Sequence, residues 1–243
     1  MQSLFPTSPS ELSDDDLAQL YAYPHDSRWL RTNFVASLDG ATQGGDLKSA
    51  SLSSKADKRV FRLLRSLCDV IVAGAGTARA EGYQPVLPSQ ARTALRTQLG
   101  LAPLPAMAIV SRSLDLDDSL IAGGAAPTVI VTTESAPPER RRQVADVAPV
   151  IVAGELDVDV PLALEELASM GYLRMLCEGG PRLMRDLLAA GAVDEICLTL
   201  SPLLVGGDRL RLVEGGDLRP AEHLQLRHLL ESDGQLFARY TKG

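Results

Sequence analysis

Short apolar segments alternate with longer amphipathic segments along most of this chain. Residues 69–74 and 128–133 are rich in Val and Ile and have the length of buried strands. Residues 53–67 instead place Val60, Phe61 and Leu64 on one helical face. This alternation predicts an α/β fold, with a mixed, mostly parallel sheet and helices on both of its faces. With 243 residues, the chain is long enough for one large domain or two small ones.

The same pattern predicts the order of the elements. We expect strands in residues 29–37, 69–74, 106–111, 128–133, 149–154, 173–180 and at the start of 195–207, and helices in 14–23, 53–67, 138–148, 161–171 and 181–191. Residues 224–242 should form a C-terminal antiparallel hairpin that turns at Asp233 and Gly234 and adds edge strands to the sheet. We expect a surface loop in residues 83–105. Residues 1–27 are expected to be an N-terminal extension, and residues 28–243 a single domain.

Composition narrows the classes of function. The formal net charge of −7 argues against a general affinity for nucleic acid or for an anionic membrane. No apolar run approaches the roughly 20 residues that span a bilayer, and the first residues do not have the pattern of a signal peptide. Cys68, Cys177 and Cys197 are far apart and each lies in or beside an apolar run, so we expect buried free thiols and a cytoplasmic protein.

Two glycine-rich turns follow expected strands and precede expected helices. The first contains Gly74, Gly76 and Thr77, but Arg79 stands where a dinucleotide fingerprint has its third glycine. The second is the run Glu178, Gly179, Gly180 and Pro181. Glycine allows a phosphate to approach the backbone, and the next helix offers free N–H groups. Either turn alone is equally compatible with a simple tight turn, whereas two turns on one sheet favour a dinucleotide held between them.

A third strand end carries Ser111 and Arg112. A hydroxyl and a guanidinium at this place could hold a 2′-phosphate and so select NADPH over NADH. A solvated turn with an exposed arginine explains the same residues equally well. The three histidines have no neighbours of the kind that form metal sites, so we expect no metal.

Four stretches of the chain resemble the pyrimidine reductases of riboflavin biosynthesis, including the reductase half of bifunctional deaminase-reductases. They are NFVASLDG, FRLLRSLCDVIVAGAGTARAE, CEGGPRLMRDLLAAGAVDEICLTLSPLLVGG and the closing hairpin. The resemblance implies a dihydrofolate-reductase-like fold, NADPH as cofactor and a homodimer. It places cofactor contacts at Ala36, Gly74, Gly76, Thr77, Ser111, Glu178, Gly179, Gly180, Pro181, Leu203 and Val205.

The same resemblance places substrate contacts at Ser49, Ser51, Arg65 and Glu81. The chain departs from the family on this side. Glu81, Gly82 and Tyr83 stand in place of Asp-Asp-Pro, Pro88 occupies the position of a phosphate-holding arginine, and Ser51 that of an aromatic residue.

The activity implied is transfer of a hydride from NADPH to a C=N bond of a ribosylamino-pyrimidine phosphate. Glu81 is the candidate for the group that protonates the nitrogen, and Arg65 for the anchor of a substrate phosphate or carboxylate. Two alternatives remain open, namely a dihydrofolate or pterin reductase on the same fold and a non-catalytic protein that senses NADPH. The expected dimer rests also on the final strands and on the apolar run EICLTLSPLLV, which a monomer would leave partly uncovered.

Overall fold

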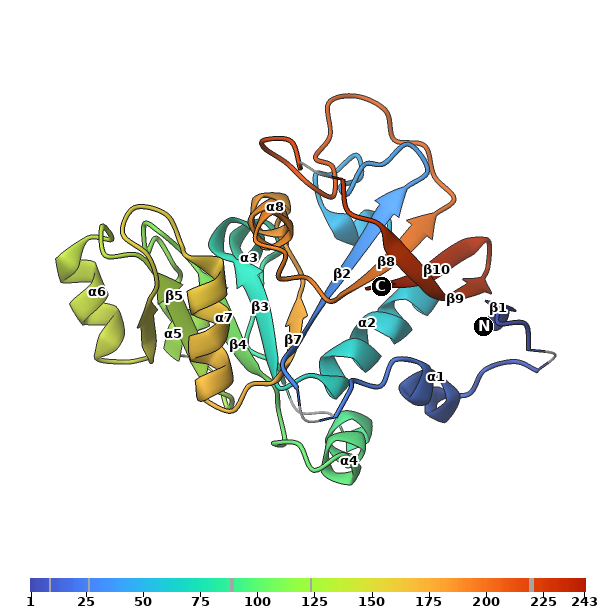
Figure 1. The fold of residues 1–243 in the computed structure, drawn as a ribbon, viewed down its shortest axis with the longest axis horizontal. Coiled ribbons are helices and arrows are strands. Elements are labelled where there is room, and N and C mark those ends of the chain that lie inside the picture. The colour runs from blue at the N-terminus through green and yellow to red at the C-terminus, as the bar shows by residue number, and fades with distance from the viewer. Residues whose placement is uncertain (9, 26, 88–89, 123, 219–220) are drawn as a thin grey trace.

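A single twisted sheet runs through the protein (Figure 1). The computed structural model describes residues 1–243 apart from 9, 26, 88–89, 123 and 219–220, so Pro88 lies outside the described residues. Within the described residues the sheet has ten strands in the order β1-β9-β10-β8-β2-β7-β3-β4-β5-β6. The strands from β8 to β6 in this order are parallel, whereas β10, β9 and β1 are added antiparallel.

Every strand that the apolar pattern predicted is present. The parallel strands are β2 (Trp29–Ser37), β3 (Val70–Gly74), β4 (Ala106–Val110), β5 (Thr128–Thr132), β6 (Val150–Val152), β7 (Arg174–Cys177) and β8 (Glu195–Ser201). The predicted hairpin consists of β9 (Leu224–Ser232) and β10 (Gln235–Lys242), and it turns at Asp233 and Gly234. These elements confirm the predicted mixed, mostly parallel α/β fold.

Two of the helices begin where capping residues predict. The helices are α1 (Asp14–Leu20), α2 (Lys55–Leu67), α3 (Ala75–Glu81), α4 (Gln90–Gln98), α5 (Asp118–Ala122), α6 (Pro138–Ala145), α7 (Val160–Ser169) and α8 (Pro181–Ala189), with a short 3₁₀ turn, η1 (Ser49–Ser51). The hydroxyls of Ser13 and Ser54 accept the N–H groups of Asp16 and Asp57, which caps α1 and α2. Among the described residues, no helix is both long and apolar enough to cross a membrane.

Two expectations about the fold were wrong, one for residues 83–105 and one for the C-terminal hairpin. Residues 83–105 are not a loop throughout, because α4 forms there and packs on α2. The fully buried Arg96 of α4 donates to the carbonyl oxygens of Cys68 and Ala102, each at 2.6 Å. The second difference concerns the hairpin, which is not at the edge of the sheet. A short strand, β1 (Gln2–Phe5), pairs with β9 and covers it.

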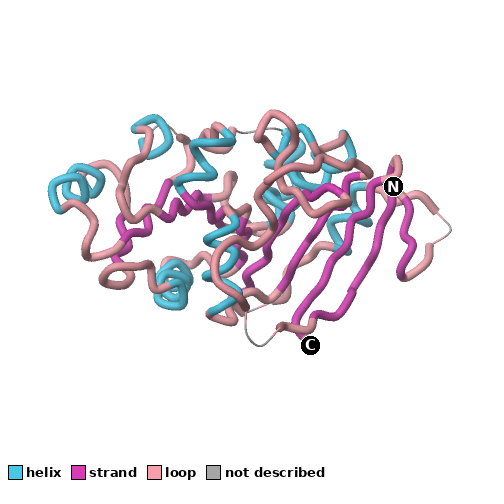
Figure 2. Tube along the Cα trace, turned by 90° about the horizontal axis from the view of Figure 1, so that it is seen from above, coloured by secondary structure: helices cyan, strands magenta, loops and turns pink. Residues whose placement is uncertain are grey.

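Helices cover both faces of the parallel part of the sheet. One face packs against α7 and α8 through Val72, Val131 and Met184, and the other packs against α1, α2, α3, α5 and α6. Seen from above, the antiparallel part carries helices on one side only (Figure 2). On the helix-covered side Arg31, Glu195 and Arg239 form a buried charge cluster, in which Arg31 Nε lies 2.6 Å and Arg239 Nε 2.8 Å from Glu195 Oε1.

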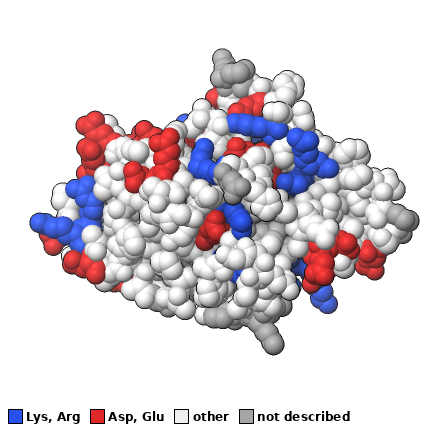
Figure 3. All heavy atoms as spheres, turned by 60° about the horizontal axis from the view of Figure 1, so that its bottom comes forward, with Lys and Arg blue, Asp and Glu red and all other residues white. Residues whose placement is uncertain are grey.

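One face of the molecule carries charged side chains of both signs (Figure 3). On the face shown in Figure 3, the lysines and arginines lie among aspartates and glutamates, with broad uncharged areas between them. All three cysteines are buried and free, as predicted.

Candidate functional site

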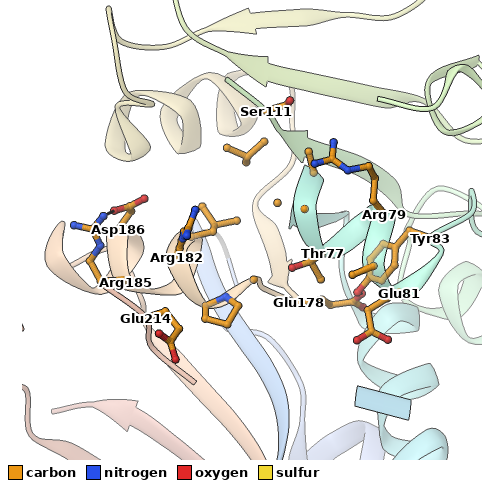
Figure 4. Close-up of a pocket in the computed structure, with 18 of the residues that line it drawn as sticks. Thr77, Arg79, Glu81, Tyr83, Ser111, Glu178, Arg182, Arg185, Asp186 and Glu214 are labelled. Carbon is orange, nitrogen blue, oxygen red and sulfur yellow. Dashed lines mark hydrogen bonds and ion pairs between the residues drawn. The ribbon is translucent and has the colours of Figure 1, made fainter. Parts of the chain in front are cut away.

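A cleft of about 1720 Å³ lies at the carboxyl ends of β3, β4 and β7. Ligands of parallel sheets bind at this edge, because the loops after the strands open there. The cleft continues over the first residues of α3 and α8 and along one face of α2. Figure 4 shows Thr77, Glu81 and Tyr83 on one side of it, Arg182 and Arg185 on the other, and Ser111 at the far end.

The two glycine-rich turns meet in the floor of the cleft. The N–H of Gly74 donates to the carbonyl of Gly179 at 2.7 Å. A Cβ on Gly180 would lie 2.3 Å from Oγ1 of Thr77, and a Cβ on Gly179, whose φ is 103°, would lie 3.1 Å from the ring of Phe34. Only glycine allows this close approach of the two turns. A Cβ on Gly76, in contrast, would meet nothing within 4 Å and would point into open space.

Glu178 is tied to residues from two other segments. The guanidinium of Arg65 on α2 makes a bidentate pair with its carboxylate, with distances of 2.7 Å from Nε to Oε1 and 2.6 Å from Nη2 to Oε2. The hydroxyl of Tyr83 donates to Oε2 at 2.6 Å. The Glu178 side chain is 2% exposed and that of Arg65 16% exposed, so water screens this pair little. Burial, and then the charge of Glu178, raise the pKa of Tyr83 and keep its proton on.

The predicted substrate residues fall into two groups. Ser49, Arg65 and Glu81 line the cleft, and Glu81 Oε1 accepts the N–H of Ser49 at 2.9 Å. Ser51 does not line it, because its hydroxyl donates to Asp46 at 2.8 Å within its own loop. A surface pairing of Glu81 with nearby Arg79 is not seen, since Arg79 lies 3.0 Å from Asp115.

The predicted cofactor residues also divide. Gly74, Gly76, Thr77, Ser111, Arg112, Glu178, Gly180 and Pro181 line the cleft. Ser111 is buried and its Oγ accepts the N–H of Leu114 at 3.0 Å, whereas Arg112 is exposed and paired with Asp157.

Ala36, Gly179, Leu203 and Val205 lie behind or beside the cleft rather than in its lining. Leu203 follows β8, and its carbonyl accepts the N–H of Leu38 at 2.9 Å. The N–H groups of Val205 and Gly206 donate to Asp39. A hydrogen bond from Ser37, followed by these two, lowers the pKa of Asp39 to about 2.

Comparison with known proteins identifies the family. The model of the RibD C-terminal domain matches residues 28–237. A 2,5-diamino-6-ribosylamino-4(3H)-pyrimidinone 5′-phosphate reductase of Archaeoglobus fulgidus is 33% identical over 72% of this chain and 80% of its own length. One of the same name from Methanothermobacter thermautotrophicus is 35% identical over 86% of this chain and 95% of its own. The chain belongs to the RibD C-terminal domain family.

A solved structure supports the assignment of the fold. The crystal structure of a pyrimidine reductase-like protein from Corynebacterium diphtheriae superposes with a TM-score of 0.83 and 27% identity, over 95% of this chain and 98% of the other. Membership of the RibD C-terminal domain family makes the protein an oxidoreductase that depends on a nicotinamide cofactor. Within the described part of the chain, no group of three or more His, Cys, Asp or Glu side chains is arranged to hold a metal ion.

Sequence reasoning overlooked several residues that line the cleft of this family member. Asp57, Lys58 and Phe61 lie on the face of α2 that ends at Arg65, and Arg182 and Arg185 lie on α8. The spacing of Asp57, Phe61 and Arg65, four residues apart, is a helical signal that could have found the first group. Tyr83 had been noted only as a departure from the family, and nothing in the sequence pointed to its contact with Glu178.

Proposed function

We propose that this protein reduces a ribosylamino-pyrimidine 5′-phosphate with NADPH in riboflavin biosynthesis. The observation that carries the proposal is one continuous cleft, which joins the paired glycine turns to the group formed by Ser49 and Glu81. The first part suits a dinucleotide and the second a small polar ring. The names of the relatives from A. fulgidus and M. thermautotrophicus supply the substrate class.

The residues of the cleft fit a dinucleotide phosphate. Gly76 leaves open space above its backbone. Gly180 is the N-cap residue of α8 and makes no side-chain capping bond, so N–H groups of the first turn of α8 are free for an anion. Thr77 offers its hydroxyl beside Gly180. Ser111 and Arg112 would meet a 2′-phosphate. Because the pair of Arg112 with Asp157 is exposed, it is worth little, and a phosphate can compete with the carboxylate for Arg112.

Reduction of a C=N bond adds a hydride to carbon and a proton to nitrogen. When bound, NADPH supplies the hydride. Glu81 is placed to hold or deliver the proton, because its carboxylate lines the cleft and is oriented by the N–H of Ser49. The protein otherwise contributes by positioning donor and acceptor.

The test is the oxidation of NADPH on addition of a substrate. We expect turnover with the diaminopyrimidinone 5′-phosphate or its deaminated uracil counterpart, and a lower Kd for NADPH than for NADH. Turnover with dihydrofolate alone would establish the pterin reductase instead. Binding of NADPH without turnover of any of the three would contradict the proposal and leave the sensor.

We also propose a homodimer, on a basis different from the exposed edge that the sequence suggested. β1 covers that edge, but one face of the antiparallel part of the sheet carries no helix. Cross-strand neighbours Leu200 and Leu236 are half-buried there, as are Leu198 and Tyr240. Light scattering tests this interface. A dimeric wild type together with a monomeric Leu236→Asp variant would support it, and a monomeric wild type would contradict it.

The three unpaired cysteines fit a cytoplasmic location, which we propose as well.

A further inference from the structure

The cations that line the cleft differ in whether they have a carboxylate partner. Four of them are paired: Arg65 with Glu178 at 2.6 Å, Arg79 with Asp115 at 3.0 Å, Arg112 with Asp157 at 2.5 Å, and Arg185 with Asp186 at 2.8 Å. Lys58 and Arg182 also line the cleft, and neither has an ion pair within the described residues. Arg182 follows Pro181 at the start of α8, beside the turns assigned to the cofactor. Of the cations that line the cleft, Lys58 is therefore the one on α2 without an ion pair in the part of the chain that the structure describes.

Arg65 is poorly placed to hold a phosphate. Its Nε and Nη2 both bind Glu178. The rings of Phe61 and Tyr83 lie 4.3 Å and 5.3 Å from its central carbon. Drawing the guanidinium to a ligand would leave the carboxylate of Glu178, which is 2% exposed, without its partner. Such an uncompensated buried charge is costly, so the pair is expected to stay closed.

Lys58 and Arg65 lie on the same helix, α2, and both line the cleft. Lys58 precedes Arg65 by seven residues, which is about two helical turns and roughly 10 Å of rise. Both line the cleft, so one helix face carries the closed ion pair near the glycine turns and a free ammonium farther out. The adjacent Asp57 lies in the first turn of α2, and its carboxylate is engaged within its own segment, where it accepts a hydrogen bond from the hydroxyl of Ser53.

We propose that Lys58 binds the 5′-phosphate of the substrate and so selects phosphorylated over unphosphorylated pyrimidines. The proposal rests on the proposed function, because it takes the phosphate from that substrate class. A lysine meets phosphate as a compact point charge with three donors, and it tolerates a flexible ligand chain.

The experiment compares wild type, Lys58→Met and Lys58→Arg with two substrates, the ribosylamino-pyrimidine 5′-phosphate and its dephosphorylated form. Arg59→Met is the matched control, because it removes one charge from the same helix but is paired with Asp14 outside the cleft. We expect Lys58→Met to lower kcat/KM for the phosphorylated substrate about ten- to a hundredfold, the range typical of a charge-assisted hydrogen bond. The loss should be confined to that substrate, be restored by Lys58→Arg and leave the Kd for NADPH unchanged.

The outcomes separate this proposal from the proposed function. If wild type reduces both substrates equally well, or if Lys58→Met weakens both alike, the assignment of Lys58 is wrong while the reductase activity stands. An equal, phosphate-dependent loss in Arg59→Met also overturns the assignment, because general charge would then explain it. If wild type reduces neither substrate, the proposed function is wrong, and the assignment of Lys58 to the substrate phosphate is wrong as well.

Discussion

The hydroxyl of Tyr83 donates a 2.6 Å hydrogen bond to Oε2 of Glu178, a residue 95 positions later in the chain. This bond joins the segment after α3 to the residue that follows β7, and both residues line the cleft. Tyr83 also faces Arg65, so one aromatic ring contacts both members of the closed ion pair. Tyr83 is one of the positions at which the chain departs from the family. Its contacts give it a structural role in the candidate site.

Tyr83→Phe should lower the free energy of unfolding by roughly 1.5–3 kcal/mol, the usual range for a hydrogen bond to a charged group. The ring and its contact with Arg65 are kept, so the change reports on the hydroxyl alone. Denaturant unfolding measures the effect. Tyr172→Phe is the control, because no hydrogen bond of the Tyr172 hydroxyl is found in the described structure. Equal stabilities of the two variants would show that the bond to Glu178 contributes nothing.

Gly76 and Gly180 should respond oppositely to alanine. Gly180→Ala places a Cβ 2.3 Å from Oγ1 of Thr77, so we expect a loss of about 1–3 kcal/mol in stability from the overpacking. Gly76→Ala meets nothing within 4 Å and lies in α3, where alanine is favoured by up to about 1 kcal/mol. It should keep or raise stability and yet weaken NADPH binding, because the methyl group blocks the approach of a phosphate to the backbone.

Thermal unfolding and NADPH titration of both variants check this contrast. The double variant Thr77→Ala with Gly180→Ala should recover part of the stability, since the clash is removed. If Gly76→Ala binds NADPH as tightly as wild type, the first turn does not approach the cofactor.

The strands could be predicted because each is a short apolar run between turn residues. A run that is apolar throughout and this short is typical of a strand that is buried on both faces of a sheet. The helices α1 and α2 could be placed by Ser13 and Ser54, whose capping pattern is local. Both the fold and the two glycine turns depend on such short-range signals, and their meeting follows from β3 and β7 being neighbours in the sheet.

Long-range polar pairing could not be predicted in this way. α4 is polar, and its anchor is Arg96, which caps the end of α2 through carbonyl groups that no sequence pattern marks. The partners Arg65 and Glu178 are 113 residues apart, and several other acids were equally plausible. Arg65 was predicted to anchor a substrate phosphate or carboxylate, and its ion pair with Glu178 was not foreseen. β1 was missed because it is short and has one buried residue, Ser3.

Glu81→Gln should separate binding from turnover. The glutamine keeps an oxygen that can accept the N–H of Ser49, so the geometry of the site is expected to survive. It cannot ionise or pass on an acid proton, so turnover should drop by roughly a hundredfold or more while the Kd for NADPH barely changes. Glu139→Gln, on the exposed surface of α6, is the control. Full turnover in Glu81→Gln would show that another group protonates the substrate.

Replacing Thr77 should act on the cofactor instead. Thr77→Val keeps the shape of the side chain beside Gly180 but removes its hydroxyl. A hydrogen bond to a charged phosphate oxygen is worth roughly 1.5–3 kcal/mol, so the Kd for NADPH should rise about ten- to a hundredfold. Saturating NADPH should restore most of the turnover, which distinguishes this variant from Glu81→Gln. An unchanged Kd would exclude the hydroxyl as a cofactor ligand.

His228 should make the protein less stable in mild acid. Burial, and then the charge of Arg239, lower its pKa from 6.5 to about 4, and its Nε2 is buried without a hydrogen-bond partner in the described structure. The unfolded chain therefore binds a proton at a higher pH than the folded protein does. Stability is complete above about pH 6.5 and falls as the pH drops towards 4, by on the order of 3 kcal/mol in total.

Glu195 titrates in a separate window. Burial by itself raises its pKa, but Arg31 and Arg239 outweigh that effect and lower it from 4.5 to about 2, so its contribution is lost only below about pH 4.5. Unfolding free energies measured between about pH 6.5 and 4.5 thus report mainly on His228. His228→Gln, which cannot bind a proton there, should flatten the curve in this range relative to wild type. An unchanged slope in the variant would show that His228 is not the group that titrates, because the slope measures the difference in bound protons between the two states.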